Sequence, residues 1–553
     1  MPLEPQQFPA TTVPTRFIGG RITTEDPAQP EADALVTDAT GRIVWIGWAN
    51  ELPAAFAGDA YKEVHLGGAR VIPGFVDAHM HAVMLANFAP QISVLPPNIT
   101  SIAELTEAIR ARRAAQGPNA WVEGWGYDEA LLAEHRSPTR WDLDAGSPDA
   151  PVCIMRTCGH IRCVNSRALE IAGITRDTPD PVGGEIERDA TGEPTGVLKE
   201  TARDLVTPFI PKPSEHDAVQ HIVDLGQLLA SQGIVAATDM CSVDGTDTHP
   251  LLLAAARAGF KQDVATYMLW DYIKQNPDAY ELGPEQMDRS QQIFAAGIKI
   301  LTDGSVSGRT AWFYDPFLPS ERDLGAANCG MPTCTDDDID HAIAFCQNHC
   351  CQLSLHAMGT HAIDRVIDRV MAAGLWDADG VPPVRIEHVT APSPHAISAM
   401  AANGIAVVTQ PIFPYAEIGT YLTNLGEERT RRCYPFRTLV DAGVDVCIST
   451  DAPATSWAVP SDPFPNIKSA VTRQAYNHFD FDATEALSVE EVLARYTREP
   501  ARILGFEGLG MLKAGYKASF AVLDRDILAI PADEIDRVQV AATYICGEKV
   551  FER

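Results

Sequence analysis

Positive charge is scarce in this chain of 553 residues: 43 Lys and Arg stand against 74 Asp and Glu, which gives a net charge of −31. Such an excess of negative charge argues against nucleic acid and anionic membranes as partners. No apolar run is long enough to span a bilayer. The opening segment, MPLEPQQFPATTVPTRF, has neither the basic start nor the apolar stretch of a signal peptide. We therefore expect a cytoplasmic protein.

Cysteine motifs are missing as well. The 12 cysteines are scattered, and no two of them form a CxxC pair. Without an export signal, free buried thiols are expected rather than disulfides or a zinc knuckle. The length predicts a large core with at least one accessory domain, and a hydrophobic content of 46% is typical of a globular protein.

The pattern of apolar residues predicts an α/β protein. Both ends alternate like short strands, as in TRFIGGRITT and VQVAATYICGEKVF, and predict a small all-β domain built from residues 1–70 and 505–553. Between them, ten strand candidates alternate with amphipathic helices, which indicates a parallel sheet covered by helices. Eight such units close a (β/α)8 barrel, here residues 71–504. One or two candidates are therefore assigned to an insertion at about 89–213.

Several strand candidates end in residues that bind metals or move protons. In VIPGFVDAHMH, His79 and His81 are two residues apart and point the same way on an extended backbone. Barrel enzymes carry their chemistry at the carboxyl ends of the strands, and imidazole and carboxylate are common zinc ligands. Four further residues occupy such positions, in GIKILTDGS, SLHAMG, RIEHV and ISTDAP: Lys299, His356, His388 and Asp451.

Structural explanations compete with these assignments. A single histidine is more often hydrogen-bonded than metal-bound, Asp451 could cap a helix, and Lys299 could be an ordinary salt-bridged lysine. His160 in TCGHIRCVN could bind the substrate or an oxyanion, or it could be structural. Aromatic residues near strand ends are more often packing than recognition. The remaining candidates for the substrate pocket are Phe88, Trp125, Tyr127 and Arg309.

These motifs together resemble a known family. GFVDAHMH, GHIRCVNSRALEIAGI, GEPTGVLKETA, DGSVSGRT, RIEHV, STDAP and YTREPARILG are similar to blocks of the YtcJ-like amidohydrolase family 3. This group of the amidohydrolase superfamily includes N-substituted formamide deformylases. The likeness is collinear from about Thr15 to Phe551. It implies a barrel with a split β-domain and a metal-dependent hydrolase of amide-type C–N bonds.

The resemblance also implies a set of metal ligands. His79 and His81 bind the more buried divalent cation, for which zinc is the expected ion. His356 and His388 hold a second cation. Lys299, carrying CO₂ as a carbamate, bridges the two. A site with one ion stays open, because carbamylation cannot be read from the sequence.

Asp451 has two roles in this scheme, as a contact of the buried metal and as a proton shuttle. A metal-activated hydroxide attacks the carbonyl of an N-substituted formamide or another N-acyl amide, and Asp451 passes its proton to the leaving nitrogen. One alternative is a mononuclear deaminase, in which Glu387 beside His388 would be the catalytic glutamate. The other alternative is a non-catalytic regulatory or binding protein. The oligomeric state is not fixed by the sequence, and a homodimer is the commonest arrangement.

Overall fold

A computed structural model describes residues 13–117, 120–129, 131–157, 161–240, 247–277, 282–320 and 327–553. The chain divides into two compact units. The first unit comprises Met1–Val83, Ile222–Ala452 and Ser461–Arg553, and the second comprises Met84–His221 and Pro453–Pro460. The domain boundaries expected near residues 70 and 505 stay predictions.

The first unit contains an eight-stranded sheet in which all neighbouring strands are parallel. In chain order, its strands are β6 (Phe75–Asp77), β13 (Ile234–Asp239), β14 (Asp263–Leu269), β15 (Ile293–Leu301), β16 (Gln352–Ala357), β17 (Val384–His388), β18 (Ala406–Thr409) and β19 (Val446–Ile448). The segment after the last strand returns to the first. There the Asp451 amide donates to the His79 carbonyl at 2.7 Å, and the His81 amide donates to the Ala452 carbonyl at 2.8 Å. The predicted (β/α)8 barrel is confirmed.

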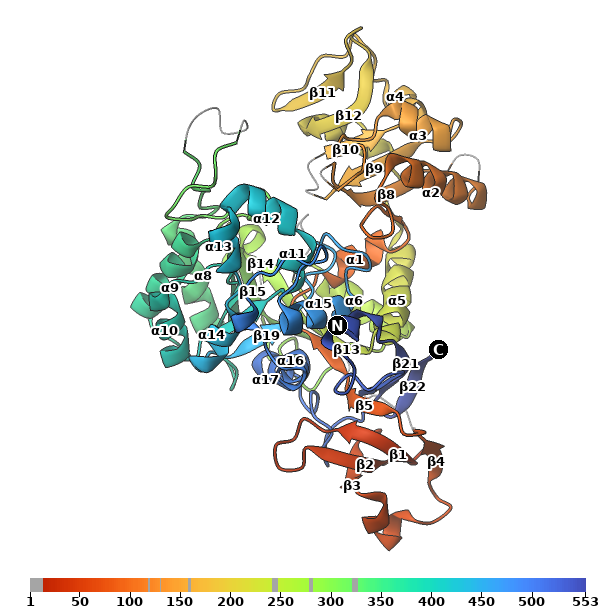
Figure 1. Cartoon of the computed structure of the whole chain (residues 1–553), viewed down its shortest axis with the longest axis vertical. Coiled ribbons are helices and arrows are strands. Elements are labelled where there is room, and N and C mark those ends of the chain that lie inside the picture. The colour runs from red at the N-terminus through yellow and green to blue at the C-terminus, as the bar shows by residue number, and fades with distance from the viewer. Residues whose placement is uncertain are drawn as a thin grey trace. The chain divides into compact units, whose positions relative to one another are not determined.

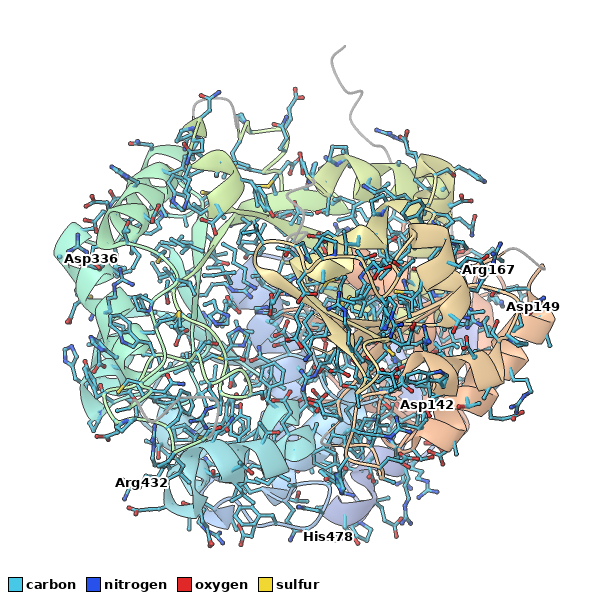
Figure 2. The ribbon with its side chains drawn as sticks, turned by 90° about the horizontal axis from the view of Figure 1, so that it is seen from above. Asp142, Asp149, Arg167, Asp336, Arg432 and His478 are labelled. Atoms are coloured by element: carbon cyan, nitrogen blue, oxygen red, sulfur yellow. The ribbon has the colours of Figure 1, made fainter. Side chains whose placement is uncertain are left out.

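Helices cover the outside of this sheet because each presents an apolar stripe to the strands. In α9 (Thr360–Ala373), Ile363, Val366, Ile367 and Val370 recur at helical spacing and join one core with the outward side chains of β16 and β17. Asp336, the first residue of α8 (Asp336–His349), lies at the outer rim of the helical layer (Figure 2). The helices of this unit besides α9 are α6 (His249–Ala258), α7 (Trp270–Ile273), α8 (Asp336–His349), α10 (Pro394–Asn403), α11 (Ile412–Ala416), α12 (Ile418–Leu425), α13 (Glu427–Arg431), α14 (Phe436–Asp441), α15 (Pro463–Thr472), α16 (Val489–Tyr496) and α17 (Arg498–Leu504).

A second sheet of the same unit joins strands from both ends of the chain. Its order is β22-β21-β20-β5-β1-β2-β3, and β4 pairs with β1. Figure 1 shows the red strands β1, β2 and β5 and the blue strands β21 and β22 in this sheet. The predicted small β-structure built from both termini is therefore confirmed. Its strands are β1 (Thr15–Thr23), β2 (Glu31–Thr37), β3 (Ile43–Gly47), β4 (Lys62–His65), β5 (Arg70–Pro73), β20 (Phe520–Leu523), β21 (Val540–Ile545) and β22 (Glu548–Glu552).

The second unit has a six-stranded sheet of its own. Its strands are β7 (Ile92–Ser93), β8 (Val122–Tyr127), β9 (Val152–Arg156), β10 (Ile161–Val164), β11 (Gly184–Arg188) and β12 (Pro194–Glu200). Two of the ten strand candidates, now β8 and β9, lie here, and the other eight form the barrel, as expected for an insertion. Its bounds at about 89–213 stay a prediction. The helices of this unit are α1 (Ala82–Phe88), α2 (Ile102–Ala115), α3 (Arg140–Gly146) and α4 (Ser166–Ala172). The next helix, α5 (Glu215–Ser231), crosses the unit boundary and lies mostly in the first unit.

Two further expectations concern the whole described chain. Every cysteine in the described ranges is a free thiol, as predicted, but not all of them are buried, since Cys350 is exposed. None of the helices that the structure describes combines the length and the apolarity needed to cross a membrane.

Candidate metal centre

Three of the predicted ligands meet beyond the carboxyl ends of the first and last barrel strands. His79 and His81 follow β6, and Asp451 follows β19. The Asp451 Oδ1 atom lies 3.3 Å from His79 Nε2 and 3.3 Å from His81 Nε2. One ligand atom of each residue lies within 4.8 Å of the other two, and no other such group of three appears among the described residues. The i, i+2 spacing of the HMH motif thus places both imidazoles beside one carboxylate.

Asp451 is held in place by its backbone and has an unsatisfied oxygen. Its φ is +55°, a conformation that costs a non-glycine residue of order 1–3 kcal/mol and marks many functional sites. The Oδ1 atom is buried and has no hydrogen-bond partner in the described structure. Burial would raise the pKa of Asp451, but His79 and His81 outweigh it and hold that pKa well below its usual value. An orphaned carboxylate oxygen that faces two imidazole nitrogens fits a cation.

The helix-cap alternative for Asp451 is not supported. The next helix, α15, begins at Pro463, and the residue that caps it is Asp462, whose Oδ1 accepts a hydrogen bond from the Phe464 amide at 3.0 Å. The carboxylate of Asp451 is therefore directed at the histidines rather than at a helix end.

His356 and His388 lie next to this group. Their ring centroids are 4.4 Å apart, and the His388 ring is 5.1 Å from that of His79. On β17 the side chain of Ile386 packs outward, and a φ of +72° at His388 ends the regular strand conformation there. Burial and the charge of Lys299 lower the pKa of His356 to about 4, and burial lowers the pKa of His388 well below its usual value. Both imidazoles are therefore neutral at pH 7, the form that binds metals.

Lys299 is the sixth member of the cluster. Its side chain is 3% exposed, and its Nζ lies 3.1 Å from His79 Nε2. Across the ranges that the structure describes, no carboxylate oxygen lies within 4.0 Å of this Nζ, so the ion pair of an ordinary salt-bridged lysine is not seen there. The structure thus brings all six predicted residues to one end of the barrel.

Glu387 and Gln410 orient the histidines, and the sequence reasoning did not assign them these roles. Glu387 Oε2 accepts a hydrogen bond from His79 Nδ1 at 2.6 Å, and Gln410 Oε1 lies 2.8 Å from His388 Nδ1. Such partners leave the other ring nitrogen free for a metal. A signal was available, because RIEHV and AVVTQP place charged or polar residues in otherwise apolar strands.

The position of Glu387 bears on the deaminase alternative. Its side chain is fully buried, and its two oxygens are occupied by Arg385, Ser354 and His79. Burial opposes ionisation, but Arg385 and then His79 hold the pKa of Glu387 well below its usual value. A carboxylate held in this way has no free oxygen to exchange protons with a substrate. The deaminase hypothesis therefore loses the glutamate on which it depended.

The five residues predicted to bind substrate do not form a single cluster like that of the six predicted ligands. His160 lies outside the described residues. Phe88 and Trp125 belong to the second unit, where their rings stack at 5.1 Å, and Tyr127 of the same unit is fully buried. In the first unit the Arg309 guanidinium is buried and donates to Asn424 Oδ1 at 3.0 Å and to the Leu318 carbonyl at 2.6 Å. These contacts are structural, and a role in substrate binding stays a prediction for all five residues.

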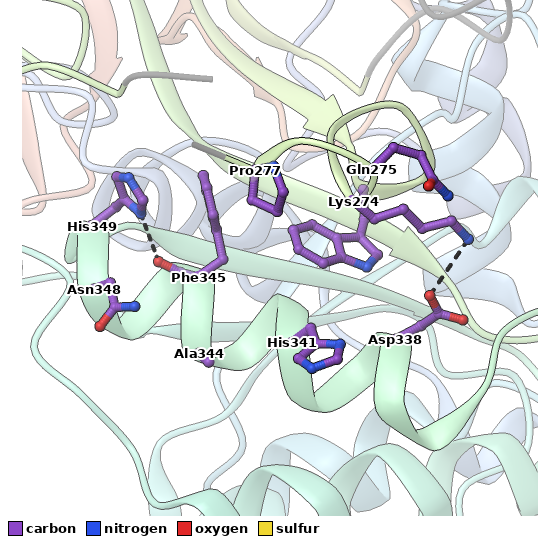
Figure 3. A pocket seen from close by; sticks show the side chains of 10 residues that line it. Lys274, Gln275, Pro277, Asp338, His341, Ala344, Phe345, Asn348 and His349 are labelled. Carbon is purple, nitrogen blue, oxygen red and sulfur yellow. Dashed lines mark hydrogen bonds and ion pairs between the residues drawn. The ribbon is translucent and has the colours of Figure 1, made fainter. Parts of the chain in front are cut away.

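A cavity of about 560 Å³ lies elsewhere on the first unit, against α7 and α8. Figure 3 shows Lys274 directed at Asp338, 3.4 Å away, and His349 bonded to the Phe345 carbonyl at 2.9 Å. None of the six predicted ligands lines this cavity. It is therefore separate from the candidate metal centre.

Comparison with known proteins identifies the family. Residues 62–551 match the model of the amidohydrolase family. The chain belongs to this family. This amidohydrolase is 29% identical to the YtcJ protein of Bacillus subtilis, over 93% of the chain and 95% of that protein. It is 28% identical to the N-substituted formamide deformylase of Arthrobacter pascens, over 97% of the chain and 98% of that enzyme.

A solved structure shares the fold of this amidohydrolase. An uncharacterized metal-dependent hydrolase from Pyrococcus horikoshii superimposes with a TM-score of 0.73 at 24% identity, covering 94% of this chain and 99% of that one. Family membership and the full-length likeness make the protein a hydrolase that acts on carbon–nitrogen bonds. The predicted resemblance is confirmed.

Proposed function

We propose that this amidohydrolase cleaves N-acyl amides, with N-substituted formamides as the first substrates to test, at a zinc centre formed by the six clustered residues. The observation that carries the proposal is that His79 Nε2 and His81 Nε2 converge on the buried Oδ1 of Asp451, which lacks a hydrogen-bond partner in the described structure. The likeness to the Arthrobacter pascens deformylase, which extends over 97% of the chain, supports the substrate class.

The residues suit two cations. His79, His81 and Asp451 would hold the more buried ion, and His356 and His388 would hold the second. Lys299 would join the two as a carbamate, an anion that has two oxygen ligands in place of the ammonium charge. Bound divalent ions would supply Lewis acidity, which polarises a carbonyl group and lowers the pKa of water.

Asp451 is the proton carrier of the proposal. Its carboxylate is directed at His79 Nε2 and His81 Nε2, and there it would take a proton from the attacking water. The same carboxylate then returns this proton to the leaving nitrogen, and the amide is released as a carboxylic acid and an amine. Glu387 and Gln410 keep the two histidines oriented while this happens.

The test is a screen of N-formyl, N-acyl and cyclic amides with the zinc-loaded enzyme. We expect N-formyl amides to be hydrolysed, a chelator to abolish the activity and added zinc to restore it. His81→Ala should be inactive, whereas the matched control His395→Ala, which changes an exposed histidine paired with Asp368, should retain activity. Undiminished hydrolysis by the chelated enzyme would contradict the proposal, and so would undiminished hydrolysis by His81→Ala.

A further inference from the structure

The interior of the barrel is unusually polar beneath the metal centre. The interiors of such barrels are filled mainly by Val, Ile and Leu. Here the strand alternation turns Leu353, Leu355 and Ile386 outward into the helical layer. The inward positions of the same two strands are polar instead: Gln352, Ser354 and His356 on β16, and Arg385 and Glu387 on β17.

Arg385 is the centre of this polar column. It is fully buried, and its Nε donates to Glu387 Oε1 at 2.5 Å while its Nη2 donates to Glu387 Oε2 at 3.0 Å. Its Nη1 lies 3.3 Å from the Tyr267 hydroxyl, which donates to Gln352 Oε1 at 2.5 Å. The planar guanidinium thus engages both carboxylate oxygens at once, which a lysine cannot do.

The same guanidinium holds His79 at two points. Through Glu387 Oε2, which is 2.6 Å from His79 Nδ1, it acts on the imidazole ring. Directly, its Nη2 donates at 2.5 Å to the carbonyl of Ala78, the residue that precedes His79. Arg385 therefore reaches across the barrel from β17 and fixes both the backbone and the ring of a residue that follows β6.

We infer that Arg385 is a positioning residue of the metal centre, which directs His79 Nε2 toward the cation without touching it. A buried ion pair is seldom more stabilising than well-packed apolar residues of similar volume, so stability alone does not account for one here. A carboxylate partner of a ligating histidine fixes its tautomer and orientation, and loss of such a partner weakens metal binding by about 10–100-fold. The inference rests on the proposed metal centre.

The test compares zinc affinity, measured by competition with a chromophoric chelator, with the melting temperature of the metal-free protein. Arg385→Met should weaken zinc binding by about 100-fold. Arg385→Lys keeps the positive charge but cannot bind both oxygens of Glu387 at once, and it should weaken zinc binding by about tenfold. Both variants should also change the absorption spectrum of the cobalt-loaded protein. Lys517→Met is the matched control, because it breaks the largely buried Lys517–Asp263 pair away from the site. It should lower the melting temperature and leave zinc affinity unchanged.

The outcomes separate this inference from the proposed function. If the parent protein binds zinc and Arg385→Lys binds it as tightly with an unchanged cobalt spectrum, Arg385 is only structural and the inference fails while the proposed function stands. Should Arg385→Met not fold, Arg385→Lys and Ser354→Ala decide, since Ser354 Oγ donates to Glu387 Oε1 at 2.8 Å. If the parent itself binds neither zinc nor cobalt, the proposed function falls and the inference with it.

Discussion

Replacing Asp451 by asparagine tests the proton-transfer step most sharply. Asparagine has nearly the same shape as aspartate. The backbone hydrogen bond from the amide of residue 451 to the His79 carbonyl at 2.7 Å, which joins the last barrel strand to the first, is therefore kept. What changes is the buried oxygen that lies 3.3 Å from both His79 Nε2 and His81 Nε2. An amide neither accepts a proton at pH 7 nor offers the negative charge that a cation prefers.

The size of the effect follows from general acid–base catalysis, which contributes about 10²–10⁴-fold to a rate. Asp451→Asn should therefore lower kcat on the best amide by at least about 100-fold, equivalent to about 2.7 kcal/mol of transition-state stabilisation. Steady-state kinetics with saturating zinc measure this loss, and metal analysis of the same samples shows how much of it reflects lost binding.

The matched control is Asp462→Asn. Asp462 is a half-buried carboxylate that caps α15, and asparagine caps helices as well as aspartate does. This variant should retain kcat within about twofold, since caps affect stability rather than chemistry. An Asp451→Asn enzyme with the parent's kcat would refute the reasoning, because no other described carboxylate joins the two histidines in this group.

Three further changes test the second metal ion, the lysine carbamate and a surface ion pair. Gln410→Leu removes the partner of His388 Nδ1 and should lower the affinity for the second zinc ion by about 10–100-fold, measured by competition with a chelator. An affinity equal to that of the parent would contradict the orienting role of Gln410. Metal-free enzyme reconstituted with zinc should regain more activity with bicarbonate than without CO₂, and Lys299→Met should show no such difference; a parent indifferent to bicarbonate would exclude the carbamate. A hydrogen bond from Arg437 lowers the pKa of Glu491 from 4.5 to about 2, so the ionised group stabilises the fold above pH 4.5 and this stabilisation is lost as the pH falls toward 2. In Glu491→Gln the melting temperature should fall less between pH 4.5 and pH 2 than it does in the parent. Because the Glu491 side chain is 31% exposed, the free energy of unfolding at pH 7 should change by no more than about 1 kcal/mol. An equal fall of the melting temperature in parent and variant over this pH range would contradict the role of Glu491.

Much of the fold was predictable because the barrel strands are buried on both faces and end in polar residues. GIVAATDM and CQLSLHAMG both contain such a strand, and both proved to be barrel strands, β13 and β16. The pairing of His79 with His81 followed from the period of an extended strand alone. The convergence of these two with Asp451 required the resemblance, because residues nearly four hundred positions apart share no local signal.

Other features depended on tertiary structure. Arg309 was expected in the substrate pocket, but its guanidinium donates to Asn424 and to the Leu318 carbonyl, contacts between segments that no pattern connects. Glu387 was weighed as a catalytic group because it adjoins His388. The strand alternation instead directs it into the barrel toward Arg385 and His79, a distinction that depends on which face of β17 lies inside.

The central claim is that six residues from five barrel strands form one metal centre. Anomalous diffraction at the zinc absorption edge from crystals of the zinc-loaded protein tests it directly. We expect a strong peak within about 2.0–2.2 Å of His79 Nε2, His81 Nε2 and an Asp451 oxygen. A zinc-bound crystal with no peak at these atoms, or with its only peaks elsewhere on the molecule, would contradict it.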